Sequence, residues 1–213
     1  MASVILLEID GLGTFFENRS EAFHLREFFN NGSLLNATAN VPTDSAENWR
    51  SILTGVVPDK HKLKLENLNK QYNNNNYPKS SLKMNKYAPN INESFILKAW
   101  MYISQYWICN SIYNSFLIKK VLEYIRNNND DPVFLFIHLV DLDKTGHLYG
   151  FNSEQCYKKL KEIDIYVKNI FETAYKYWNN PLIIVTTDHG GIETSSHSGN
   201  SLKEKNVHWL KLV

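Results

Sequence analysis

Aspartate and histidine side chains directly follow three apolar runs of the sequence, and these residue types are the ones best suited to do chemistry. They are Asp10 after residues 4–9, Asp143 and His147 after residues 132–140, and Asp188 and His189 after residues 182–187. Carboxylate and imidazole groups side by side suit a divalent metal ion such as zinc. His197, a few residues after the third run, is a further candidate ligand. The residue types therefore predict a metal site; the alternative is a set of polar turns, because aspartate is common in turns.

The three apolar runs predict strands of one sheet. Each is rich in Val, Ile, Leu or Phe with little polar alternation, which is typical of parallel strands buried on both faces. In open α/β sheets, ligands bind at the carboxyl ends of the parallel strands. Scattered polar residues would not be expected to fall at this edge three times, so the pattern favours a metal site over a set of turns.

Ser45 lies where a helix is expected to begin, because residues 46–53 have helical character and Gly55 ends them. One interpretation makes Ser45 the N-cap of this helix, a common role for serine. The other makes it a nucleophile in the positive field of the helix N-terminus, which also attracts phosphate. A serine hydroxyl needs a base or a metal to become nucleophilic. No histidine lies near Ser45 in the sequence, so this hypothesis requires a metal held near Asp188 and His189.

The rest of the sequence supplies helices that would cover such a sheet. Helical spacing of apolar residues occurs at 19–31, 93–128 and 152–178, and shorter runs at 33–37 and 207–213 predict further strands. Strands and helices in this alternation predict an α/β fold, and 213 residues suit one domain. The polar, asparagine-containing residues 62–92 are interpreted as a loop or cap-like insertion.

Composition limits the partners and the compartment. The chain is 43% hydrophobic with a formal net charge of +1, which is typical of globular proteins and gives no general attraction to nucleic acid or acidic membranes. The apolar stretch 95–118 contains a lysine and several amides, and is too polar to span a bilayer. Cys109 and Cys156 are expected to be buried apolar residues rather than ligands. The first ten residues do not resemble a secretory signal, so a cytoplasmic protein is expected.

Four sequence blocks, in this order, resemble the alkaline phosphatase superfamily, and most closely its type I phosphodiesterase/nucleotide pyrophosphatase branch. They are Ile5–Gly11, Pro42–His61, Asp143–His147, and Thr186–Gly191 followed by His197. The resemblance implies a three-layer sandwich around a largely parallel central sheet, formed by residues 1–213 as a single domain with a reduced cap. The chain departs from the family pattern at Lys62, where glycine is usual, and in the one-residue-longer segment 195–199.

The resemblance also assigns roles to individual residues. Asp10, Ser45, Asp188 and His189 would hold one metal, and Asp143, His147 and His197 the other, with His208 as a substitute for His197. Ser45 would attack phosphorus and carry a covalent phosphoryl group, and Asn67, which matches the family pattern loosely, would bind substrate. Two cations can clamp the attacking and leaving oxygens of a displacement at phosphorus. Mixed aspartate and histidine ligation favours zinc over magnesium.

The function implied by the resemblance is two-metal hydrolysis of phosphodiesters or nucleotide pyrophosphate bonds. The substrate would be a small phosphorylated molecule, with neither a nucleic acid polymer nor a membrane as partner. One alternative is a phosphomonoesterase, for which Arg50 and Lys60 are possible cationic groups. Another is a shortened, non-catalytic relic that binds a ligand or partner. A sulfatase is disfavoured, because the Cys/Ser-x-Pro-x-Arg environment of its nucleophile is absent from the sequence.

Overall fold

The structure is a computed structural model that describes residues 3–55, 114–128 and 132–212. The expected insertion at 62–92 and the first part of the helical segment 93–128 lie outside these residues, as do Asn67 and Cys109. In the described part, strands and helices alternate as the sequence predicts. The fold is therefore α/β, and the site can be followed from the elements that carry its residues.

A central sheet organises the described residues. Its strands are β1 (Val4–Ile9), β2 (Ser33–Thr38), β3 (Phe134–Leu139), β4 (Leu182–Thr186) and β5 (Asn206–Leu212), in the order β2-β5-β4-β1-β3. β1 lies between β3 and β4 and is parallel to both. β5 is antiparallel to β4 and to β2. The sheet is thus largely parallel, with β5 as the reversed strand.

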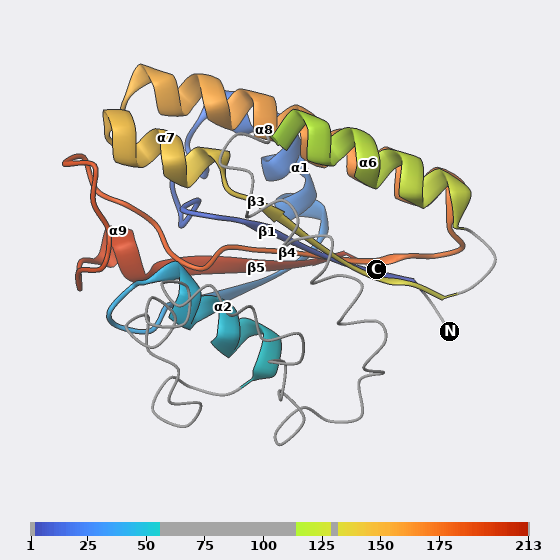
Figure 1. Cartoon of the computed structure of the whole chain (residues 1–213), viewed down its shortest axis with the longest axis horizontal. Helices are drawn as coiled ribbons and strands as arrows, with labels where there is room; N and C mark the ends of the chain where they lie inside the picture. Colours follow the sequence, from blue (N-terminus) through green and yellow to red (C-terminus); the bar gives the residue numbers. More distant parts are fainter. Residues whose placement is uncertain (1–2, 56–113, 129–131, 213) are drawn as a thin grey trace, which may run out of the picture.

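Helices lie on both faces of the sheet, which gives the three layers expected from the sequence (Figure 1). One face is covered by α1 (Phe23–Asn31), which follows the short 3₁₀ helix η1 (Ser20–Ala22), and by α6 (Asn114–Asn127), α7 (Asp141–Tyr149) and α8 (Glu154–Tyr177). The opposite face carries α2 (Ser45–Thr54). The short helix α9 (Leu202–Lys205) leads into β5. The predicted Ser45 site therefore lies across the sheet from α8.

The long helix α8 is fixed by its sequence at both the start and the buried face. Ser153 is its N-cap and accepts a hydrogen bond from the Cys156 backbone N–H. Apolar residues at intervals of three and four then form a buried stripe that packs in the core. Asp164, also on this face, accepts hydrogen bonds from the backbone N–H groups of His24 and Leu25 and so anchors the start of α1. Cys156 is buried, as predicted.

Alternation along β1 gives the two faces of the sheet different chemistry. Ile5, Leu7 and Ile9 are fully buried in the core cluster that includes the α8 stripe. Glu8 lies between Leu7 and Ile9 and therefore points to the other face, as does Asp10 just beyond the strand. The register pairs Glu8 with His138 of β3 and with Thr186 of β4. A polar row thus crosses three parallel strands on the face that carries α2.

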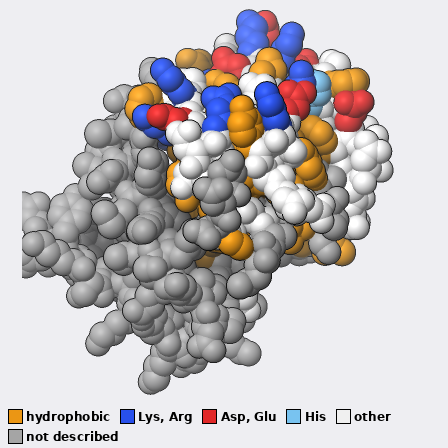
Figure 2. Space-filling view, turned by 90° about the vertical axis from the view of Figure 1, so that its right-hand side faces the viewer, with side chains coloured by type: hydrophobic (Ala, Val, Ile, Leu, Met, Phe, Trp, Pro, Cys, Tyr) orange, Lys and Arg blue, Asp and Glu red, His pale blue; other side chains and the backbone are white. Residues whose placement is uncertain are grey.

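The outer surface of the helical layer carries charges of both signs. Figure 2, which views the molecule from the right-hand side of Figure 1, shows Lys or Arg and Asp or Glu side chains interspersed over the described residues at the top of the view. Many are ion pairs one helical turn apart, such as Lys120–Glu123 and Lys158–Glu154, which stabilise little because water screens them. Among the helices that the structure describes, none is long and apolar enough to cross a membrane.

Candidate active site

The carboxyl ends of β1, β3 and β4 bring the predicted ligands together. Asp10 follows β1, Asp188 follows β4, and α7 with Asp143 and His147 follows β3. In the described residues, two groups have ligand atoms within 4.8 Å of one another: Asp143 with His147 and His197, and Asp10 with Asp143 and His189. Asp188 lies beside the second group, its Oδ2 being 3.5 Å from His189 Nε2. The parallel register explains this, because it aligns all three strand ends at one edge.

Ser45 is the first residue of α2, and Asp44 occupies the N-cap position. The interpretation of Ser45 as an N-cap is therefore wrong. Its Oγ lies 2.9 Å from His189 Nε2 and 3.3 Å from Asp10 Oδ1. The histidine that the sequence around Ser45 lacks is thus supplied by the segment after β4. The half-buried hydroxyl sits where the helix N-terminus adds a positive field.

Asp143 and His147 follow β3, as predicted, and both lie on the helix α7. Their spacing of four residues places both side chains on one face of the helix, with His147 Nε2 3.4 Å from Asp143 Oδ2. Gly146 is required between them, because a Cβ there would lie 2.5 Å from the Phe151 ring. Close packing of Phe151 on α7 therefore explains the glycine that precedes His147.

The side chains of His147 and His197 are oriented so that they could hold a metal ion together. The Nδ1 atoms donate to backbone carbonyls, that of His147 to Ser195 O at 3.1 Å and that of His197 to Thr43 O at 2.8 Å. A neutral imidazole with hydrogen on Nδ1 has a lone pair on Nε2. The two Nε2 atoms face each other at 3.0 Å, which is repulsive unless a cation or proton lies between them. Histidine metal ligands are commonly oriented by such carbonyl contacts.

In the second group, His189 also presents Nε2 with a lone pair, and Asp188 lies beside it. His189 is fully buried and its Nδ1 donates to the backbone carbonyl of Gly190 at 2.9 Å, which leaves a lone pair on Nε2. This Nε2 lies 3.4 Å from Asp10 Oδ1. Asp188 Oδ1 accepts hydrogen bonds from the backbone N–H groups of Gly11 and His189, whereas its buried Oδ2 has no hydrogen-bond partner among the described residues. Several lone pairs therefore converge next to Ser45.

The electrostatics of the site are those of buried carboxylates clustered together. Burial and the charges of Asp188 and Asp143 raise the pKa of Asp10 well above its ordinary value, although the Ser45 hydrogen bond lowers it. Burial also raises the pKa of Asp143 and lowers that of His197, which favours the neutral imidazole. Asp143 Oδ1 is buried without a hydrogen-bond partner in the described residues. Unpaired carboxylate oxygens beside neutral imidazoles are a donor set that fits divalent cations.

Two further polar residues at the site were not predicted. Glu8 is fully buried, and neither of its carboxylate oxygens has a hydrogen-bond partner among the described residues. Burial, with repulsion from Asp188 and Asp10, raises the pKa of Glu8. His138 Nε2 contacts Asp10 Oδ2 at 3.0 Å, and burial lowers the pKa of His138 well below its ordinary value. The sequence does contain a signal for them, because each is a polar residue inside an apolar run. In a strand, side chains alternate between the two faces, which places Glu8 and His138 on the same face of the sheet as Asp10.

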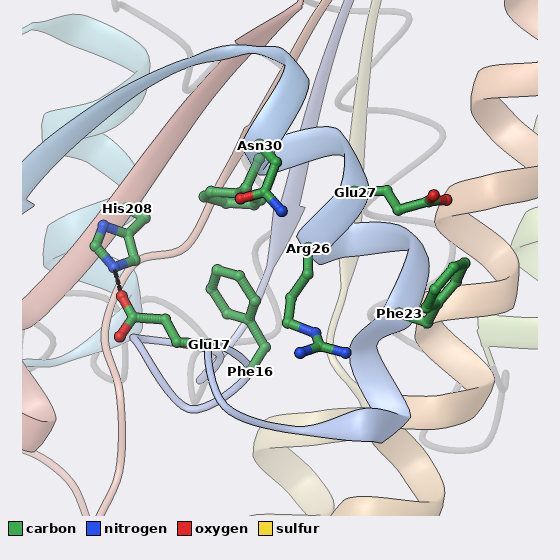
Figure 3. Close-up of a pocket in the computed structure, with 8 residues that line it drawn as sticks. Phe16, Glu17, Phe23, Arg26, Glu27, Asn30 and His208 are labelled. Atoms are coloured by element: carbon green, nitrogen blue, oxygen red, sulfur yellow. Dashed lines mark hydrogen bonds and ion pairs between the residues drawn. The ribbon is translucent and has the colours of Figure 1, made fainter.

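A pocket of about 400 Å³ lies in another part of the molecule, between α1 and β5 (Figure 3). Its lining residues are Phe16, Glu17, Phe23, Arg26, Glu27, Phe29, Asn30 and His208. The imidazole of His208 is joined to the Glu17 carboxylate, as Figure 3 shows. His208 therefore does not lie with Asp143, and the structure places His197 there instead. Asn67, Lys60 and the side chain of Arg50 lie outside what the structure describes.

The sequence matches a family model and several curated proteins. The family model described as Type I phosphodiesterase / nucleotide pyrophosphatase matches residues 4–107 and 63–210. Bis(5'-adenosyl)-triphosphatase ENPP4 of Pongo abelii is 24% identical over 217 residues, covering 90% of this chain and 48% of that protein. GPI ethanolamine phosphate transferase 1 of Gibberella zeae is 30% identical over 95 residues, covering 43% of this chain and 10% of that protein. The match thus spans about half the length of the first relative and a tenth of the second.

Two solved structures have a similar fold. Murine ectonucleotide pyrophosphatase / phosphodiesterase 5, in an inactive form in complex with AMP, has a TM-score of 0.60 at 18% identity, covering 89% of this chain and 57% of that one. A Bacteroides fragilis protein named as a sulfatase, yidJ, has a TM-score of 0.64 at 11% identity, covering 99% and 67%. Together with the family match, which spans more than half of the sequence, these findings show that the chain belongs to the type I phosphodiesterase/nucleotide pyrophosphatase family, with an alkaline phosphatase-like fold.

Proposed function

We propose that this chain hydrolyses phosphoric esters with the help of two divalent metal ions and with Ser45 as the nucleophile. The observation that carries the proposal is the position of Ser45 Oγ, 2.9 Å from His189 Nε2 and 3.3 Å from Asp10 Oδ1 at the start of α2. Membership of the family supports phosphodiesters or nucleotide pyrophosphate bonds as the substrate class. The ENPP4 relative, named as a bis(5'-adenosyl)-triphosphatase, belongs to the same class of chemistry.

The metal ligands in this proposal fall into two sets. Asp10, Ser45, Asp188 and His189 would hold one ion, and Asp143, His147 and His197 the other. Zinc suits these sets, because three of the ligands are imidazoles held in the tautomer that presents Nε2. When bound, the ions would neutralise charge on the phosphoryl oxygens and help Ser45 to lose its proton. The exposed His147 side chain leaves this part of the site accessible from solvent.

Contacts within the chain orient the Ser45 hydroxyl and the start of α2. The Ser45 hydroxyl hydrogen is directed at His189 Nε2 or Asp10 Oδ1, so the oxygen keeps a lone pair for attack on phosphorus. The amide groups of the first turn of α2 would stabilise the negative charge of the phosphoryl group transferred to Ser45. The Thr43 carbonyl and hydroxyl accept hydrogen bonds from His197 Nδ1 and the Ser198 N–H. These contacts hold the start of α2 against the loop that carries His197.

Ser45→Ala tests the nucleophile. With zinc content verified, we expect hydrolysis of an aryl phosphodiester to fall by at least about 10³-fold, because no other hydroxyl replaces the attacking oxygen. The melting temperature should change little, because Asp44 and not Ser45 is the N-cap. Ser45→Thr, which keeps a hydroxyl, should retain part of the activity. Ser20→Ala, in η1, is the matched control and should behave as the unchanged protein. Equal rates for Ser45→Ala and the unchanged protein would refute the nucleophile.

Transfer to an alcohol is a second candidate, favoured by the relatives named as GPI ethanolamine phosphate transferases. The same serine could pass its phosphoryl group to an alcohol instead of water. Reaction of an aryl phosphodiester in the presence of a primary alcohol distinguishes transfer from hydrolysis. A transferase yields the alkyl ester, whereas a hydrolase yields the free acid. The same assay with an aryl monoester tests the phosphomonoesterase alternative. Absence of bound metal after zinc incubation would favour a non-catalytic relic.

A further inference from the structure

His138 is a residue of β3 on the sheet face that carries α2, and it contacts Asp10, which lies next to Ser45. In the parallel register it is opposite Glu8, so its imidazole and the Glu8 carboxylate share one face of the sheet. Its Nε2 lies 3.0 Å from Asp10 Oδ2 and 3.4 Å from Glu8 Oε2. The side chain is 9% exposed. A nearly buried imidazole thus contacts a proposed metal ligand on the side away from Ser45.

The tautomer of His138 differs from those of the other site histidines. Asp10 must be ionised to bind a metal ion, and an ionised carboxylate only accepts hydrogen bonds. In that state, the contact with Asp10 Oδ2 requires hydrogen on His138 Nε2. His147, His189 and His197 instead carry hydrogen on Nδ1, which donates to a backbone carbonyl. His138 therefore presents a donor where the other three present a lone pair. This is the arrangement of a residue that orients a ligand rather than one that binds the metal itself.

Trp49 connects His138 to the helix that carries the nucleophile. The indole and imidazole ring centroids are 3.7 Å apart with planes at 74°, and Trp49 also packs edge-on against Phe136 of β3. Trp49 follows Ser45 by four residues, about one turn of α2, so both side chains lie on the same helix face. The imidazole is consequently packed between α2 and the carboxylates of Glu8, in β1, and Asp10, just after β1.

We infer that His138 is a positioning residue: its Nε2–H holds Asp10 Oδ2, so that Asp10 Oδ1 stays directed at Ser45 and His189. A carboxylate has two equivalent oxygens and rotates freely unless one is fixed. Glu8, which contacts the same Nε2, and Trp49, which packs on the ring, hold the imidazole in place. The inference rests on the proposed function, because it concerns the metal that Asp10 would bind.

Three variants of His138 separate its hydrogen bond from its packing. His138→Phe keeps an aromatic ring against Trp49 and removes the donor. His138→Gln places an amide N–H near the position of Nε2, whereas the shorter His138→Asn places its amide near Nδ1, out of reach of Asp10. Phe136→Leu is the control, because Phe136 packs against Trp49 but is paired with Leu6, four residues before Asp10. The readouts are zinc affinity by calorimetry on metal-stripped protein, kcat and KM for an aryl phosphodiester, and the melting temperature.

We expect His138→Phe and His138→Asn to bind zinc about 10–100-fold more weakly at one of two sites, since loss of an outer partner of a ligand has this effect. The kcat should fall by a similar factor with KM within about twofold, because Asp10 would be misdirected at Ser45. His138→Gln should recover most of both losses, and Phe136→Leu should keep the zinc affinity of the unchanged protein.

Three results would overturn the inference. The first is an unchanged zinc affinity in both His138→Phe and His138→Asn. The second is a His138→Gln variant that binds zinc as weakly as His138→Asn does. The third is a zinc stoichiometry of one in every His138 variant, which would make His138 a metal ligand. If one variant does not fold, the comparison of the other two decides. A protein that binds zinc but cleaves no phosphoric ester would refute the proposed function, while the zinc affinities would still test the role of His138.

Discussion

Removal of metal should destabilise this protein strongly, because the fold gathers negative charge at one sheet edge. Glu8, Asp10, Asp143 and Asp188 lie within mutual electrostatic range, and Glu8 and Asp188 are essentially inaccessible to solvent. Buried carboxylates repel one another unless a cation neutralises them. The two histidine Nε2 atoms that face each other at 3.0 Å add a second repulsive contact. We therefore expect chelation to lower the melting temperature.

The size of the effect follows from the two proposed sites. A ligand present at 100 times its dissociation constant stabilises the folded state by about 2.7 kcal/mol, so two sites contribute about 5 kcal/mol. For a domain of 150–250 residues, 1 kcal/mol shifts the melting temperature by about 2–4 °C. The chain has 213 residues. Chelation should therefore lower its melting temperature by about 10–20 °C.

The assay is thermal unfolding followed by circular dichroism, on protein incubated with zinc, with chelator, and with zinc restored. His147→Ala removes a ligand of one site only, so its chelator-induced shift should be about half that of the unchanged protein. His24→Ala, on α1, is the control and should show the full shift. Identical melting temperatures with and without chelator would refute the reasoning that a cation balances these carboxylates.

The chelator-induced shift should grow with pH. The pKa values of Glu8, Asp10 and Asp143 are raised in the fold, so the metal-free folded state binds protons more tightly than the unfolded chain. Its stability is therefore lost as pH rises from the ordinary carboxyl range through these raised values. Metal binding requires the deprotonated ligands and so becomes stronger over the same range. A shift that is larger at pH 6 than at pH 8 would contradict this.

Two further variants test the loops that hold the site. Gly190→Ala should destabilise the fold by about 1–3 kcal/mol in denaturant unfolding, because a Cβ would lie 2.1 Å from the Lys203 carbonyl oxygen; full stability would contradict this packing. Burial would raise the pKa of Glu204, but hydrogen bonds from Ser201 and Gly199 hold it below its ordinary value. The ionised Glu204 carboxylate therefore stabilises the fold at pH values above the ordinary pKa of a carboxyl group, and this stabilisation is lost as pH falls through the lowered pKa. Glu204→Gln should accordingly be less stable than the unchanged protein at pH 7 and approach it near pH 3, and a pH-independent difference would exclude this linkage.

Much of the architecture is determined locally and could be predicted from the sequence. The apolar runs that become β1, β3 and β4 have little polar alternation, and such runs form buried parallel strands whose carboxyl ends share an edge. The prediction that Asp10, Asp143 and Asp188 meet there needs only this rule. Gly55 ends α2 in the left-handed conformation that glycine adopts readily, so the end of α2 was also predictable.

Other features depend on pairing between segments that are distant in the sequence. Glu8 and His138 lie inside apolar runs, and only the register of β1 on β3 shows that they face each other beneath Asp10. The tautomers of His147 and His197 are set by the carbonyls of Ser195 and Thr43, which no local pattern reveals.

The choice between His197 and His208 was likewise decided only by the tertiary structure. Both histidines follow the Asp188-His189 pair, so sequence order does not distinguish them. β5 runs antiparallel beside β2, and this pairing carries His208 to Glu17 and away from Asp143. His197 lies in the loop before α9, where its Nδ1 reaches the Thr43 carbonyl. The sequence thus determined which residue types gather at the sheet edge, whereas strand pairing and loop contacts, which depend on long-range packing, decided which individual side chains meet there.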